Sequence, residues 1–241
     1  MRRLLATIKT DISVQSRNQF YTIAIAIALV FAIILSQLIR PEQIITVIPA
    51  LLLLIVGGTT LLFVGGLIIA EKDEGTLSAI IVSPLRPTEY LWSKIITLTL
   101  LATLEVVVLI GGALAIMSFS RKIAWPNLII FLTGIIAINI AYTFLGIALS
   151  VRYKKITDYV VPVLFIAIFL QLPIIHFWGI FEHPLFLLIP SSAPIQLIQG
   201  SLLKLEAWQW FYAIGYIVLQ LTVLTGWAYQ AFDKHIIRKV G

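Results

Sequence analysis

Long apolar runs separated by short charged clusters constrain this chain more than any other feature of its sequence. Six runs of about twenty residues or more lie at 20–39, 49–70, 94–117, 127–150, 159–181 and 208–231. A helix of about twenty apolar residues is long enough to cross the hydrocarbon core of a bilayer. The chain is also 60% hydrophobic and only 12% charged, which lies outside the range of soluble globular proteins. We therefore expect an all-α integral membrane protein with six transmembrane helices, in which residues 1–241 form a single domain.

Two segments outside these runs carry their own patterns. Residues 1–19 combine a basic set with an apolar set at helical spacing, which is typical of an amphipathic helix at the membrane surface; the alternative is a disordered basic tail. The basic set is Arg2, Arg3, Lys9 and Arg17, and the apolar set is Leu4, Leu5, Ile8 and Ile12. Residues 182–207 contain two apolar pieces that are too short to cross a bilayer. They predict a re-entrant or surface-lying hairpin on the outer side, before the last span.

Prolines and glycines modify the predicted spans. Pro162 and Pro173 lie within the fifth apolar run and are expected to interrupt its helix. The second run contains the pairs Gly57-Gly58 and Gly65-Gly66; Gly58 and Gly65 are seven residues apart, which places the two pairs on one side of a helix. Small residues allow another helix to approach closely, and we interpret both pairs as packing positions.

The distribution of Lys and Arg predicts the orientation of the chain. With the amino terminus in the cytoplasm, thirteen of these residues fall on that side and four on the other, as the positive-inside rule requires. The thirteen are Arg2, Arg3, Lys9, Arg17, Lys72, Arg86, Lys94, Arg152, Lys154, Lys155, Lys234, Arg238 and Lys239, and the four are Arg40, Arg121, Lys122 and Lys204. Both termini and the segments 71–93 and 151–158 are then cytoplasmic. Because the net charge of +6 is divided among these clusters, we expect no nucleic acid partner.

The most polar stretch is Glu71-Lys72-Asp73-Glu74, which directly follows the second apolar run. Four consecutive charges cannot remain in hydrocarbon, so the chain leaves the membrane here. Leu77, Ile80 and Ile81 then share one face of a short helix that Pro84 ends, and Gly75 is expected to allow the turn into it. A charged segment followed by an apolar stripe favours contact with another protein; the alternative is a solvated loop between two spans.

Few polar residues lie at membrane depth. Glu105 is the twelfth residue of the third predicted span, where an acid costs roughly 2.5–3.5 kcal/mol to insert. Asn139 and Thr143 share a face of the fourth span, and Gln171 and Gln220 add amides to the fifth and sixth. These five residues are candidates for a substrate pathway or, equally, for hydrogen bonds between helices.

Several chemistries have no support in the sequence. The chain contains no GxxxxGK[ST] loop for nucleotide phosphates, no HExxH, no GxSxG and no cysteine. The three histidines, His176, His183 and His235, lack the spacing of metal ligands. We expect no enzyme activity, metal or cofactor in this chain.

The stretch from Glu71 to Leu77 continues into Ser83-Pro84-Leu85, Glu89-Tyr90 and Lys94. With the basic entry helix, six spans and the irregular outer hairpin, this pattern resembles the permease subunit of an ABC-2 type ABC exporter. Among small permeases of this kind the chain looks most like the drug (fluoroquinolone-type) exporters, followed by haem-exporter-like permeases.

The resemblance implies that residues 71–83 are a coupling helix that docks on a separate ABC ATPase subunit. The coupling residues would be Glu71, Asp73, Glu74, Gly75, Thr76, Leu77, Ile80, Ile81 and Pro84. Two permeases, identical or homologous, and two ATPase subunits holding ATP and magnesium would export a small lipophilic compound or drug across the inner (plasma) membrane by alternating access. The alternatives are export of haem, lipid or glycan or, in another class, an independent channel or intramembrane enzyme.

Overall fold

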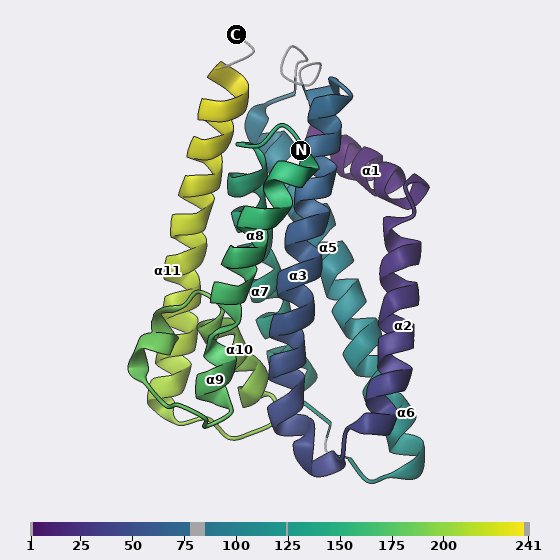
Figure 1. The fold of residues 1–241 in the computed structure, drawn as a ribbon, viewed down its shortest axis with the longest axis vertical. Helices are drawn as coiled ribbons and strands as arrows, with labels where there is room; N and C mark the ends of the chain where they lie inside the picture. Colours follow the sequence, from purple (N-terminus) through teal and green to yellow (C-terminus); the bar gives the residue numbers. More distant parts are fainter. Residues whose placement is uncertain (1, 78–84, 124, 239–241) are drawn as a thin grey trace.

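The computed structural model of the chain describes residues 2–77, 85–123 and 125–238 (Figure 1). Helices dominate these residues, and no strand occurs among them. Six helical segments of this part of the chain are long and apolar enough to cross a membrane. They are Phe20–Leu38, Pro41–Asp73, Pro87–Ser120, Leu128–Ser150, Ile156–Phe177 and Ala207–Ile237. The all-α membrane class and the number of spans predicted from the apolar runs are confirmed.

The described residues form a series of helices and helical turns. In chain order they are α1 (Arg2–Arg17), α2 (Phe20–Leu38), the 3₁₀ turn η1 (Pro41–Gln43), α3 (Ile44–Asp73), α5 (Pro87–Val106), the π-helical turn η2 (Val107–Gly111), α6 (Gly112–Ser120), α7 (Leu128–Ser150), α8 (Ile156–Gln171), α9 (Pro173–Phe177), the 3₁₀ turn η3 (Pro184–Leu188), α10 (Ser192–Gly200), α11 (Ala207–Phe232) and the π-helical turn η4 (Asp233–Ile237). Helix α1 and the carboxyl end of α11 lie at the same end of the bundle (Figure 1), here called the α1 end.

Helices α3 and α7 form the centre of the bundle. Helix α7 packs against α3, α5, α10 and α11, while α8 packs mainly on α3 and α2 packs along η2 and α6. A Cβ atom at Gly65 would lie 1.9 Å from the Tyr159 ring, and one at Gly57 would lie 3.3 Å from the Tyr142 hydroxyl. Both glycines therefore admit a tyrosine from a neighbouring helix, as the packing interpretation predicts, whereas Gly58 and Gly66 face open space.

Helix α1 lies crosswise to the spans and turns into α2 at Gln19 (Figure 1), whose φ of 61° is left-handed. The helix was expected from its sequence, but the face that it buries was not. Asp11 and Gln15 are its buried residues, and Leu5 is exposed. A polar face therefore attaches α1 to the bundle, mainly through α5.

Several predicted boundaries shift. Helix α3 begins at Ile44 and contains Pro49 near its start, and the third span begins at Pro87, seven residues before the predicted Lys94. The expectation that Pro162 interrupts the fifth span is wrong, because α8 continues through it. Pro162 leaves only the carbonyl of exposed Asp158 unbonded, near the start of the helix, where water can satisfy it. The expected interruption at Pro173 is present, because α8 ends at Gln171 and α9 begins at Pro173.

The segment before the last span folds inward. Most of α10, from Ser192 to Ile198, is buried, and the helix packs against α7 and α11. The tyrosine hydroxyls of Tyr212 and Tyr216 on α11 donate to the backbone carbonyls of Leu187 and Leu188, which holds the preceding turn in place. This packing fits the re-entrant alternative better than the surface-lying one.

Candidate functional site

The predicted coupling stretch begins at the α1 end of the bundle, where α3 ends. Asp73, Glu74 and Thr76 are exposed there, and Gly75 has a φ of 71°, the left-handed conformation that glycine adopts readily in a turn. Ile80, Ile81 and Pro84 lie outside the described residues. The described part of the stretch thus presents two acids and a threonine on the surface.

Two residues of the same stretch face inward instead. Leu77 is only 2% exposed and packs in an apolar cluster with Leu67, Ile68 and Leu91. Glu71 is also buried, in α3. Neither side chain is available on the surface of this chain: Leu77 follows the turn at Gly75 and packs against α3 and α5, and Glu71 contacts Tyr90 and Lys94 of α5. The expectation that Leu77 offers an exposed apolar anchor is corrected accordingly.

A buried ionic network joins α1, α3 and α5 directly below this stretch. The Lys94 ammonium, on a residue 2% exposed, lies 2.6 Å from Asp11 Oδ1 and also pairs with Glu71 Oε1. Ser93 Oγ donates to Asp11 Oδ2 at 2.5 Å, and the Tyr90 hydroxyl donates to Glu71 Oε2 at 2.6 Å. Each of the four carboxylate oxygens therefore accepts a hydrogen bond, two of them from the shared Lys94 ammonium, and such pairing is the condition for keeping charges buried.

The network extends toward the start of α2. Gln15 Nε2 donates to Thr97 Oγ1 at 3.0 Å, and the Tyr21 hydroxyl donates to Gln15 Oε1 at 3.2 Å. Thr97 Oγ1 in turn donates to the backbone carbonyl of Ser93 at 2.9 Å. Through these bonds the entry helix is fixed to α5 and to the first turn of α2.

Lys72 links the same end of α3 to the connection between α7 and α8. Its ammonium donates to the backbone carbonyls of Val151 and Tyr153, at 2.8 Å each. Lys72, which belongs to the charged stretch Glu71-Lys72-Asp73-Glu74, therefore bonds to the backbone after α7, and the sequence pattern did not indicate this contact.

The predicted pathway residues do not form one constellation. The Thr59 hydroxyl on α3 lies 3.1 Å from Glu105 Oε2 and 2.9 Å from the Ile55 carbonyl, and Asn139 Nδ2 donates to Thr103 Oγ1 at 3.1 Å. Glu105 and Asn139 thus take part in contacts between helices, on two sides of α5. This geometry agrees with the hydrogen-bonding alternative for these two residues.

The remaining candidates are dispersed. Thr143 and Gln220 are buried, and the side-chain polar atoms of both lack a hydrogen-bond partner in the part of the chain that the structure describes. Gln171 is half-buried at the end of α8. No group of three or more His, Asp or Glu residues that could hold a metal occurs among the described residues.

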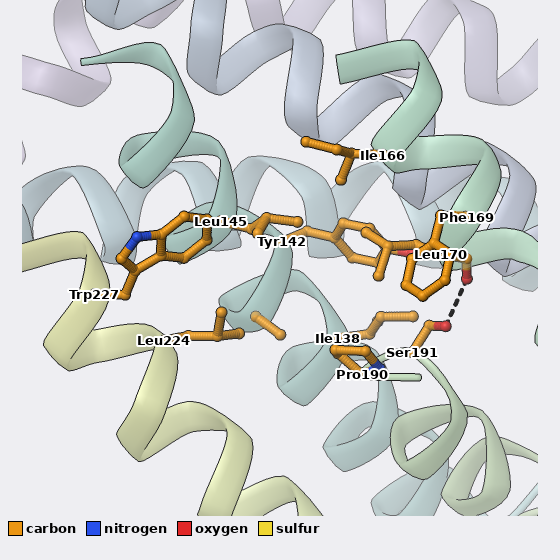
Figure 2. Close-up of a pocket in the computed structure, with 11 residues that line it drawn as sticks. Ile138, Tyr142, Leu145, Ile166, Phe169, Leu170, Pro190, Ser191, Leu224 and Trp227 are labelled. Atoms are coloured by element: carbon orange, nitrogen blue, oxygen red, sulfur yellow. Dashed lines mark hydrogen bonds between the residues drawn. The ribbon is translucent and has the colours of Figure 1, made fainter. Parts of the chain in front are cut away.

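An apolar cavity of about 260 Å³ lies between α7, α8 and α11 (Figure 2). Its lining contains none of the five predicted pathway residues. It is formed by Ile138, Ala141, Tyr142, Leu145, Ile166, Phe169, Leu170, Pro190, Ser191, Leu224 and Trp227. The Ser191 hydroxyl donates to the Leu170 carbonyl at 2.5 Å, so the one aliphatic hydroxyl in the lining is already bonded.

The sequence pattern singles out Glu71, Tyr90 and Lys94, but it does not indicate that they form an ionic network with Asp11 and Ser93. A signal was present, because Tyr90, Ser93, Lys94 and Thr97 recur at i, i+3, i+4 and i+7, which places them on one helical face. Asp11 and Gln15 have the matching i, i+4 spacing on the entry helix. The expected third span starts only at Lys94, so the residues before Lys94 are assigned to a loop and the shared helical face is not recognised.

Known proteins resemble this chain over its full length. A sequence profile of the Fluoroquinolones export permease protein family matches residues 2–240. The fluoroquinolones export permease proteins of Mycobacterium tuberculosis strains CDC 1551 and H37Rv are each 27% identical to it over 247 residues, covering 100% of this chain and 99% of theirs. Together with the six membrane helices, the profile match establishes that the chain belongs to the fluoroquinolones export permease protein family.

Proposed function

We propose that this chain is the membrane subunit of an ATP-driven exporter that moves a small lipophilic compound or drug out of the cytoplasm. A separate ABC ATPase, in two copies, would supply the energy, and a second permease, identical or homologous, would complete the pathway. The family supports drug export, since the relatives are named as export permeases. We assign ATP and magnesium to the partner and no catalytic step to this chain.

The observation that carries the coupling part of the proposal is the Asp11–Lys94–Glu71 network. Glu71 lies two residues before exposed Asp73, and its partner Lys94 lies seven residues after the first residue of α5, Pro87. A partner that displaces the exposed turn would therefore act on α1, α3 and α5 together, through a short and fully bonded contact. A channel or an intramembrane enzyme would give no reason for this link between a surface turn and three helices.

Charge reversal of the exposed acids tests the docking surface. Asp73→Arg combined with Glu74→Arg should reduce recovery of the ATPase in a pull-down from detergent extracts by about tenfold or more, since about 1.4 kcal/mol is tenfold in affinity. The double variant should fold normally, because both side chains are exposed. ATP hydrolysis stimulated by cargo should fall in parallel.

The matched control is Glu182→Arg, which reverses an exposed acid near the opposite end of the bundle. It should leave ATPase recovery unchanged. Equal recovery with the control and the double variant would remove the docking role from this turn. Failure of the unaltered chain to co-purify with any ATPase would overturn the proposal as a whole.

The proposed orientation places the α1 end in the cytoplasm of a cell whose inner membrane holds the chain. A reporter fused after Gly241 should then read cytoplasmic, and one inserted at Glu182 should read external. Glu182 is exposed, whereas Ser192 in α10 is buried and would not tolerate an insertion. Finding both reporters on one side would contradict this orientation.

A further inference from the structure

We propose that the cavity between α7, α8 and α11 is a binding site for a neutral apolar molecule taken from the bilayer, either an alkyl chain or an uncharged aromatic ring. Figure 2 shows the cavity with α7 between the other two helices and the Pro190–Ser191 turn beside it. The site is distinct from the predicted pathway residues, none of which lines it.

The chemistry of the lining selects the ligand. No charged residue lines the cavity, and the Ser191 hydroxyl is used by the Leu170 carbonyl. The Tyr142 hydroxyl lies against Gly57 on α3, so Tyr142 offers its ring to the cavity. A buried water needs two to four polar partners, which this lining does not supply. An apolar molecule is therefore the occupant that the cavity stabilises.

The size of the cavity sets the scale of that occupant. A cavity of about 150 Å³ lined by Leu, Ile and Phe stays dry and binds benzene. The cavity described here, at about 260 Å³, is larger and also offers the rings of Tyr142, Phe169 and Trp227. Arg152 lies 5.2 Å from the centre of the Trp227 ring and stabilises that wall from outside the cavity. A substituted ring system or a length of alkyl chain fits this volume.

The surroundings of the cavity point to the bilayer as the source. Phe169 on its rim is 52% exposed, so the cavity reaches the surface of the chain. The helices on either side expose apolar side chains, which are Val161, Leu164, Phe165 and Ile168 on α8 and Ile214, Val218, Leu219 and Val223 on α11. Such surfaces face lipid in a membrane protein. An occupant would therefore enter sideways, between α8 and α11, from the hydrocarbon layer.

Photolabelling of the purified permease in phosphatidylcholine vesicles, without any ATPase, tests the site. The two probes are a small neutral aryl diazirine and a phosphatidylcholine with a diazirine in its acyl chain. Either probe should label Tyr142 and Leu145 on α7, since a molecule in the cavity touches them and Tyr142 is otherwise buried. Label on outward residues such as Val223, 61% exposed, reports ordinary contact with lipid.

Filling the cavity provides the decisive variants. Ala141→Phe should remove most of the label from Tyr142 and Leu145 and leave the outward label unchanged. Ala26→Phe, at an exposed position of α2, should change neither. Leu224→Trp fills the cavity from another wall, in case Ala141→Phe fails to fold, and Val223→Trp is its outward-facing control. Absence of label on Tyr142 and Leu145 with both probes, or label on these two residues that survives both fillings, would overturn the proposal.

The two probes also separate the sources of the ligand. Labelling by the acyl-chain probe alone assigns the cavity to a bound lipid. Labelling by the aryl probe, competed by unlabelled uncharged aromatics, assigns it to the class of membrane-dissolved cargo, an assignment that rests on the proposed export function. The labelling experiment contains no ATPase, so it measures binding to the cavity alone. A chain that fails to export in cells could therefore still bind the probes, and a chain that exports could fail to bind them.

Discussion

The α1 end of the bundle and the middle of α7 bury polar groups in opposite ways. At the α1 end, all four carboxylate oxygens of Asp11 and Glu71 have a donor from α5. Around α7, within the described residues, the Asn139 carbonyl oxygen, the hydroxyls of Tyr142 and Thr143 and the Gln220 amide have no partner. The first region is a closed, fully bonded contact, and the second combines unpaired polar atoms with a neighbouring apolar cavity.

This difference indicates which region holds one arrangement and which can accept several. Separating the ions of the first network would leave charges buried without partners, which costs several kcal/mol. Rearranging the second region breaks few bonds, because few are made. We therefore expect the α1 end to transmit displacement as a rigid body and the α7 region to adapt to ligands. Each prediction below tests one side of that contrast.

Loss of Lys94 should have the largest effect on stability. Lys94→Met leaves Asp11 and Glu71 buried side by side without their shared cation, so we expect a loss of about 3–5 kcal/mol in the free energy of unfolding. The measurement is thermal unfolding of the purified permease in detergent, followed by tryptophan fluorescence and aggregation.

The matched control for this variant is the exposed pair between Arg238 and Asp233. Arg238 Nε lies 2.7 Å from Asp233 Oδ2, but the arginine side chain is 76% exposed. Arg238→Met should change unfolding little, because solvent screens an exposed pair. Similar thermal unfolding midpoints for Lys94→Met and Arg238→Met would show that the buried network at the α1 end contributes no more to stability than an exposed ion pair.

The sequence predicts the spans well because apolar length is a local property, recorded in each run. It does not predict the network. In the sequence, Asp11 and Gln15 have the pattern of the solvent-facing side of a surface helix, and only the packing of α1 on α5 buries them. The cavity is still less visible. Ala141 and Leu145 have the sequence pattern of ordinary core residues of α7, and the space beside them depends on where α8, α11 and the Pro190–Ser191 turn lie in the fold. Tertiary spacing of this kind leaves no periodicity in the chain.

Glu105 lies between the two extremes, and its replacement should have an intermediate effect. The Thr59 hydroxyl has one proton, which it can donate either to Glu105 or to the Ile55 carbonyl. Glu105 therefore does not have a hydrogen-bond donor of its own at Thr59. Glu105→Gln keeps an acceptor of the same shape and should alter stability by about 1 kcal/mol or less.

We expect Glu105→Gln to change transport or cargo selectivity while expression stays nearly normal, measured as drug accumulation in cells. Thr59→Val is the control that removes only the donor. Normal transport in Glu105→Gln would return Glu105 to a structural role in the contact between α3 and α5.

The smallest change, Tyr142→Phe, gives the clearest test of the α7 region when it is paired with Tyr159→Phe. Both tyrosines are buried, but the Tyr159 hydroxyl donates to the Leu61 carbonyl at 2.6 Å, whereas the Tyr142 hydroxyl has no partner within the described residues. Tyr159→Phe should therefore lower the free energy of unfolding by about 1 kcal/mol or more, while Tyr142→Phe should leave it unchanged or raise it by a similar amount. Thermal unfolding in the same detergent compares the two variants directly, and both keep the aromatic ring, so packing against Gly57 and Gly65 is preserved. If Tyr142→Phe destabilised the chain as much as Tyr159→Phe does, the Tyr142 hydroxyl would have to be bonded to a water or a ligand. The polar atoms around α7 would then not be unsatisfied, and the contrast with the α1 end would be wrong.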